Sequence, residues 1–153
     1  FLASGLVLSS CKKDESDPEP EDTKKTEETS PCEGGDGFCM DYGTVNKSGP
    51  AKLFVYNQSK IRVFWEQGEG ETFEQVELDV YGLTPGTYDA NDLAIDGSAF
   101  VQYYSQSSGT NNVAYGTVEV TELDTNGVVT GTFNVTMRDS TKITNGVFTN
   151  ISK

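Results

Sequence analysis

The sequence predicts an all-β fold for Cys32–Lys153, an antiparallel β-sandwich or barrel-like domain. Short runs rich in β-branched and aromatic residues alternate there with turn residues about every 8–12 positions. Apolar residues in this region do not recur with the helical spacing of roughly 3.6 residues. Asn126-Gly127, a pair that tolerates positive φ, stands between two alternating runs and is typical of a β-hairpin turn.

The part of this region before Val113 contains five expected strand segments. Lys52–Tyr56 and Lys60–Trp65 are β-rich runs that three polar residues separate. Phe73–Tyr81 alternates aliphatic residues on one face with acidic residues on the other. Pro85-Gly86 predicts a corner that leads into a short strand. Ala99–Tyr104 is the fifth segment.

The last third gives the clearest pattern. Val113–Glu122 is expected to pair with Val128–Arg138 across the Asn126-Gly127 turn. Alternation places a set of apolar side chains toward the core, namely Val118, Val120, Phe133, Val135 and Met137. A closing strand, Val147–Ile151, is expected after a second turn at Asn145-Gly146.

Residues 1–10 are uncharged, apolar and too short to span a bilayer, which needs about 20 apolar residues. The step from Leu8 to Cys11 resembles the lipobox of bacterial lipoproteins. The resemblance implies that the sulfur of Cys11 carries a diacylglycerol and that residues 1–10 are the remnant of a cleaved signal peptide, truncated at its start. The alternative is that residues 1–10 form a buried element and Cys11 is a core thiol.

Residues 11–31 are expected to be a lipidated cysteine followed by a disordered acidic linker, because no apolar residue follows Cys11 until Cys32. Lys12-Lys13-Asp14-Glu15 resembles the export tag of surface lipoproteins of the Bacteroidota. The expected location is therefore the outer membrane, lipid-anchored and exposed at the cell surface. The alternative for these four residues is a solvated charge run.

The composition excludes several classes of function. With 11 basic and 24 acidic residues the net charge is −13, so neither nucleic acid nor an anionic lipid surface is an expected partner. The chain contains no His, which excludes a Ser–His or Cys–His nucleophile. No cofactor is expected. The expected partners are the membrane, through the lipid on Cys11, and an envelope protein or a glycan.

The cysteines Cys32 and Cys39 are expected to form a disulfide, because an exported protein meets an oxidising compartment. The alternative is a metal site that uses these two cysteines and acidic neighbours. Without His or a further Cys, a zinc ion would lack its usual ligands there.

Three further motifs point to a family. They are Gly116-Thr117-Val118, Gly131-Thr132-Phe133 and Asn145-Gly146-Val147-Phe148. Together with Gly86-Thr87-Tyr88 they resemble the strand motifs of a group of uncharacterised outer-membrane lipoproteins of the Bacteroidota with a C-terminal all-β domain. The resemblance covers roughly residues 50–151. It implies a compact β-sandwich or barrel-like domain and no catalytic residues.

The acidic residues suggest two hypotheses, a catalytic carboxylate pair and a calcium site. Glycosidases use a carboxylate pair, and the candidate acids are Asp79, Asp89, Asp92 and Asp96. Oxygen ligands also cluster in one expected loop as a calcium candidate, comprising Asp89, Asn91, Asp92 and Asp96, although the spacing is not that of an EF-hand. For both sets, solvated acids on strands and turns are the more favoured interpretation.

Aromatic residues offer a third hypothesis, a stacking surface for sugar rings. Its main candidates are Trp65, Tyr103 and Tyr104, with Tyr56, Tyr81 and Tyr115 as further members. Packing in the core is the more favoured interpretation. We expect a non-enzymatic, lipid-anchored binding or interaction module of the bacterial envelope. The alternative is a glycan-binding or glycan-hydrolysing surface lipoprotein.

Overall fold

The computed structural model describes residues 36–57 and 59–153, and the described part is all-β, as the sequence predicts. The strands, in chain order, are β1 (Gly37–Tyr42), β2 (Val45–Gly49), β3 (Ala51–Tyr56), β4 (Lys60–Gln67), β5 (Glu74–Val80), β6 (Gly86–Ala90), β7 (Ser98–Ser105), β8 (Gly109–Leu123), β9 (Val128–Met137) and β10 (Lys142–Ser152). One short 3₁₀ turn, η1 (Gly70–Thr72), lies between β4 and β5. Among the described residues, no helix is long and apolar enough to cross a membrane.

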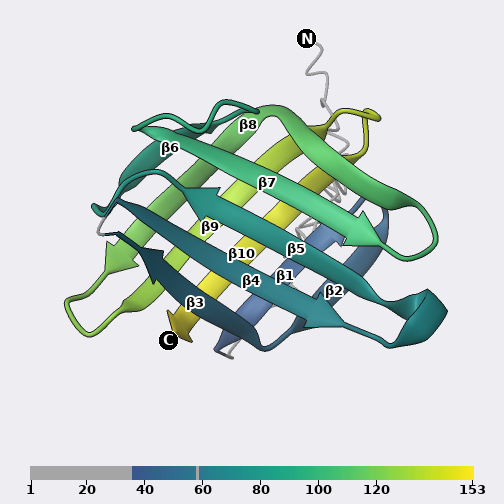
Figure 1. The fold of residues 1–153 in the computed structure, drawn as a ribbon, viewed down its shortest axis with the longest axis horizontal. Coiled ribbons are helices and arrows are strands. Elements are labelled where there is room, and N and C mark those ends of the chain that lie inside the picture. The colour runs from purple at the N-terminus through teal and green to yellow at the C-terminus, as the bar shows by residue number, and fades with distance from the viewer. Residues whose placement is uncertain (1–35, 58) are drawn as a thin grey trace, which may run out of the picture.

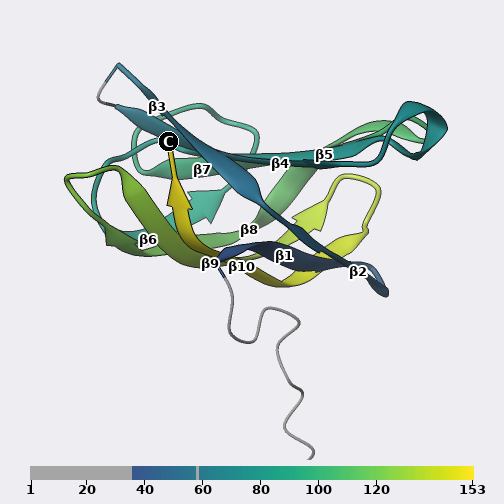
Figure 2. The same ribbon diagram turned by 90° about the horizontal axis from the view of Figure 1, so that it is seen from below.

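The ten strands form one sheet in the order β2-β1-β10-β9-β8-β6-β7-β5-β4-β3. The sheet folds over so that β3, β4, β5 and β7 lie against β1, β10, β9 and β8 in two layers (Figures 1 and 2). β8 joins the layers, because its first residues pair with β7 and its later residues pair with β6 and β9. The sheet is antiparallel except for β6 and β7, which make a two-residue parallel pairing.

The core fills the space between the two layers. The expected inward set on β8 and β9 is buried, and so are Val76, Leu78 and Val80 of β5. The ring of Phe38 on β1 stacks on Trp65, with centroids 5.7 Å apart, and on Phe133, with centroids 5.5 Å apart. Aromatic side chains from both layers therefore pack at the centre of a mostly aliphatic core, whose burial stabilises the fold.

One expected turn is wrong. Asn145-Gly146 lies inside β10, at a register shift between Ile143 and Gly146, and the chain turns earlier, between β9 and β10. Asn145 has a φ of 51°, which makes it a bulge residue. A Cβ at Gly146 would lie 2.5 Å from the carbonyl oxygen of Phe133, so glycine is needed for close packing there and not for a turn.

The layers are also tied together by polar contacts at one end, which we call the closed end (Lys47, Glu74 and Tyr103). Lys47 of β2 is only 8% exposed, and its ammonium lies 2.5 Å from the carboxylate of Glu74 on β5. The ring of Tyr103 lies 5.7 Å from the same ammonium and stacks on Tyr42 with centroids 4.0 Å apart. Burial alone would raise the pKa of Glu74, but hydrogen bonds from Lys47 and Gln67 and the charge of Lys47 outweigh it, so the pKa is lowered.

Candidate binding site at the open end of the sandwich

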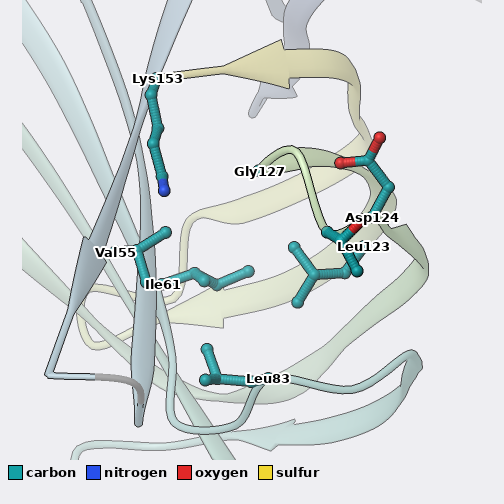
Figure 3. A pocket seen from close by; sticks show the side chains of 8 residues that line it. Val55, Ile61, Leu83, Leu123, Asp124, Gly127 and Lys153 are labelled. Carbon is teal, nitrogen blue, oxygen red and sulfur yellow. The ribbon is translucent and has the colours of Figure 1, made fainter.

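The candidate site is a pocket of about 280 Å³ at the other end of β4 and β5, which we call the open end. It lies between the β3–β4 hairpin and the turn that joins β8 to β9, and Figure 3 shows its walls. The lining consists of four aliphatic side chains, one turn and one lysine, namely Val55, Ile61, Leu83, Leu123, Asp124, Thr125, Gly127 and Lys153.

The apolar wall follows from strand alternation. Val55 and Ile61 are partners across the β3–β4 hairpin, so both point to the inner face of the sheet. Ile61 is buried at 1% exposure, whereas Val55 is 38% exposed because β3 is the last strand of the sheet. Leu123 ends β8, and Leu83 lies in the loop before β6. Apolar side chains from separate parts of the chain therefore converge on one opening (Figure 3).

The Asn126-Gly127 turn is confirmed, and it forms one rim of the pocket. Asp124 accepts hydrogen bonds from the backbone N–H groups of Val128, at 2.8 Å, and Asn126, at 2.9 Å. The bond from Val128 is the largest of several that lower the pKa of Asp124. Gly127 has a φ of 79°, as this turn requires. The carboxylate of Asp124 thus serves the turn, and in Figure 3 it points away from the aliphatic side chains.

Lys153 supplies the charge that faces the pocket. Its side chain passes over the turn, since a Cβ at Gly127 would lie 2.9 Å from Cε of Lys153. In Figure 3 its nitrogen points toward Val55 and Ile61. Within the described part of the chain, Lys153 makes no ion pair. The site therefore combines an apolar wall with a cation that makes no ion pair and a carboxylate that serves the turn.

The edge strand β3 extends the site beyond the pocket. It pairs only with β4 in the described sheet, so its outer backbone groups have no ladder partner there. Phe54, Val55 and Tyr56 are consecutive and 41%, 38% and 40% exposed. On the outer face, Phe54 packs edge-on against Phe64 with centroids 6.4 Å apart, and the ring of Tyr56 lies 4.7 Å from the ammonium of Lys60. An apolar strip thus runs along the edge next to the pocket.

The carboxylate candidate Asp79 has a structural role. It is 2% exposed and forms ion pairs with Lys60 at 2.9 Å and with Arg62 at 2.6 Å. Arg62 donates to both of its oxygens. The hydrogen bonds from Lys60 and Arg62 occupy both of its oxygens, so they are not free to act on a substrate.

The calcium hypothesis is not supported by the loop geometry. The side-chain oxygen of Asn91 accepts from the N–H of Leu93 at 2.8 Å, and its nitrogen donates to the carbonyl of Asp89, which makes an ordinary Asx turn. Asp92 is instead paired with Arg138. Asp89, Asn91, Asp92 and Asp96 do not converge, and residues 36–57 and 59–153 hold no group of three or more His, Cys, Asp or Glu side chains that could bind a metal ion.

The stacking hypothesis is wrong for two of its three main residues. Trp65 is 0% exposed and Tyr103 is 4% exposed, because both point between the layers, so no sugar ring reaches them. Tyr104, its neighbour on the opposite face of β7, is half-buried and donates a hydrogen bond to Gln106 at 2.8 Å. Of the further members, Tyr56 and Tyr115 are exposed, at 40% and 64%, and Phe54, which was not among the candidates, is exposed at 41%.

The cysteine predictions concern mostly residues outside the described part of the chain. Cys11 and Cys32 lie there, as do the expected signal peptide and linker. Cys39 is fully buried in β1. The lipid on Cys11 and the Cys32–Cys39 disulfide remain predictions.

Sequence reasoning missed the pocket residues Val55, Leu83, Leu123 and Lys153. One available signal was the run Phe54-Val55-Tyr56, which places apolar residues on both faces of a strand. A strand inside a one-sided sheet alternates, so such a run indicates either complete burial or an apolar edge. Lys153 reaches the pocket only because of how the chain folds, so no local sequence pattern indicated its place there.

The fold and the pocket define a class: a small all-β sandwich domain with one folded-over sheet and an apolar opening beside an edge strand. A family model described as Domain of unknown function (DUF6252) matches residues 66–152, more than half of the chain. The chain belongs to that family. The matched segment contains β5–β10 and the β8–β9 rim of the pocket, whereas β3 precedes it. No curated protein and no solved structure matches the chain.

Proposed function

We propose that this protein is a lipid-anchored, non-enzymatic binding module of the bacterial envelope, and that it binds at the open end of the sandwich. One observation carries the proposal: three consecutive apolar residues, Phe54, Val55 and Tyr56, are exposed on an edge strand beside an apolar pocket. Soluble domains usually protect an edge strand with charge, proline or a covering element. In β3 the charged residue is Lys52, and the run Phe54–Tyr56 that follows carries no charge. An exposed apolar run on an edge strand is typical of a binding surface.

The other edge strand makes the contrast clear. β2 has three consecutive polar residues at its centre, Asn46, Lys47 and Ser48, whereas the second half of β3 is the apolar run Phe54-Val55-Tyr56. Polar and charged side chains are a usual way to blunt an edge. Val45 is exposed there at 54%, but it stands alone. The two edges therefore differ in the property that matters for recognition, which is the exposure of consecutive apolar residues.

The non-enzymatic part of the proposal has three supports. The chain contains no His, and the most buried candidate carboxylate, Asp79, is held by two cations. Asp124 is the carboxylate that lines the pocket, and its oxygens serve the β8–β9 turn. A general acid–base mechanism needs a titratable group that reaches the substrate.

The anchor is supported by the lipobox resemblance at Leu8–Cys11. Mass spectrometry of the protein from its host membrane tests it. We expect a mature chain that begins at Cys11 and carries a diacylglycerol on sulfur, with a Cys11→Ser variant released from the membrane. An unmodified thiol with residues 1–10 still attached would rule the anchor out.

Photo-crosslinking in living cells tests the binding site. A photoreactive amino acid at position 55 is expected to give a discrete crosslinked species, because Val55 lies on both the edge and the pocket. Position 45, exposed on the opposite edge strand, is the matched control. Equal crosslinking from both positions, or none from position 55, would contradict the proposed site.

A second candidate function, glycan binding, is favoured by the exposure of Phe54, Tyr56 and Tyr115. Aromatic faces that remain accessible on a β-sheet surface can stack on sugar rings. A glycan array with the full chain, repeated with Tyr56→Ala and Tyr115→Ala, tests this candidate. Binding that is lost in one variant supports it, and an array without binding excludes it for the glycans tested.

A further inference from the structure

The lining residues of the open-end pocket indicate the chemical class of its ligand. The geometry points to a molecule with an unbranched hydrocarbon chain that ends in a carboxylate, bound with the chain against Val55, Ile61 and Leu123 and the carboxylate at Lys153. This inference rests on the proposed function, because it assigns a ligand class to the same site.

The cation is the first argument. Lys47, Lys52, Lys60, Arg62 and Arg138 each have a carboxylate within ion-pair distance. Among the described lysines and arginines, only Lys142 and Lys153 have none. In a chain of net charge −13, an ammonium without a carboxylate partner is uncommon. A ligand carboxylate supplies the missing partner.

The neighbouring carboxylate does not neutralise this charge. Asp124 accepts hydrogen bonds from Val128 and from both the backbone and the side chain of Asn126. These bonds occupy both of its carboxylate oxygens within the turn, and in Figure 3 the carboxylate lies well apart from the Lys153 ammonium. Asp124 and Lys153 therefore line the same pocket without forming an ion pair, and the ammonium is open to a ligand carboxylate.

The wall is the second argument. Its side chains are aliphatic, with no aromatic ring among the lining residues. Sugars and planar ligands are usually held by aromatic faces, whereas a flexible hydrocarbon chain gains from aliphatic contact alone. A volume of about 280 Å³ lies at the lower end of the range for ligand pockets, roughly 300–1,000 Å³, so the pocket accommodates a single chain.

A chain-length series tests the hydrocarbon part. Hexanoate, octanoate, decanoate and dodecanoate are titrated into the full chain below their micelle concentrations and followed by amide NMR shifts. The affinity is expected to rise about fourfold per methylene and then level off when the pocket is full. Shifts are expected at Val55, Ile61 and Gly127. An affinity independent of chain length, or no binding, would overturn the inference.

A charge series tests the carboxylate part. Lys153→Met keeps the length of the side chain and removes its charge, and it is expected to weaken decanoate binding about fivefold while leaving decanol unaffected. Lys142→Met is the matched control, because Lys142 is the other unpaired lysine and lies at the start of β10, away from the pocket. Equal losses in the two variants, or no loss in Lys153→Met, would overturn the charge assignment.

The two proposals fail in different ways. If no carboxylate binds but position 55 still crosslinks in cells, the ligand class is wrong and the binding site stands. If carboxylates bind and Val55→Asp abolishes that binding, while Val45→Asp does not, the ligand class and its site are both supported. If neither carboxylates nor crosslinks are found, both proposals are wrong.

Discussion

The two ends of the sandwich differ in how their charged side chains are paired. At the closed end, Lys47 reaches from the edge strand β2 to Glu74 in the other layer, and Tyr103 packs beside the pair. At the open end, Val55 and Lys153 face a cavity that no described side chain fills. At the closed end, a charge that is paired between the layers stabilises the fold. At the open end, we propose that an unpaired charge serves recognition.

Breaking the closed end is expected to have the largest effect. Lys47→Ala leaves Glu74, which is 21% exposed, without its cation in a mostly buried position. Removing one partner of a buried pair costs about 3 kcal/mol, so the free energy of unfolding should fall by about that amount in urea denaturation. Lys142 is exposed and makes no ion pair, so Lys142→Ala is the control. It should change the free energy of unfolding by less than about 0.5 kcal/mol. Similar effects in both variants would show that the ion pair does not hold the layers together.

Acid is expected to weaken the same end. The pKa of Glu74 is lowered in the folded state, so the carboxylate binds its proton less readily there than in the unfolded chain. Its contribution to stability is present above the ordinary glutamate pKa of 4.5 and is lost as the pH falls through the lowered pKa of the folded state. Urea midpoints between pH 6 and pH 3 should therefore fall more steeply for the wild type than for Lys47→Met. Parallel curves would contradict this coupling.

A smaller loss is expected from Tyr103→Phe. The Tyr103 hydroxyl hydrogen-bonds Glu74, and the variant keeps the ring that packs against Tyr42 and Lys47. Loss of one such bond costs about 1 kcal/mol. Thermal denaturation should show the loss in the wild-type background and little of it in Lys47→Ala, because the two changes act on one network.

The smallest effect on stability is expected at the open end. Val55→Asp alters a side chain that is 38% exposed, so the free energy of unfolding should change by less than about 1 kcal/mol while ligand binding is lost. Val45→Asp is the matched control on β2 and should change neither property. A large loss of stability in Val55→Asp would mean that the open end is part of the core rather than a binding site.

Much of the fold could be predicted because the pattern is local. The alternation of β5 and the β8–β9 hairpin follow from residues close in sequence, and the Asn126-Gly127 turn was found for that reason. β1 and β2 were missed, since Gly37–Gly49 shows little alternation and acquires its structure by pairing β1 with the distant β10. The turn prediction at Asn145-Gly146 was wrong because the same residue pair also suits a β-bulge inside a strand.

The site was harder to predict than the fold. Trp65 and Tyr103 were plausible sugar platforms by residue type, but only the direction of each side chain on its strand decides exposure, and both point inward. The pocket joins Val55 to Leu123 and Lys153, which lie far apart in the sequence. Such a site depends on how the sheet folds over, and no local pattern encodes it.

Amide hydrogen exchange of the full chain, with and without a solubilised extract of its own cell envelope, compares the two ends most directly. We predict that added protection appears at residues 53–56 and 123–127 of the open end and leaves residues 45–49 of the opposite edge unchanged. Protection at residues 45–49, or none at either edge, would contradict binding at the open end.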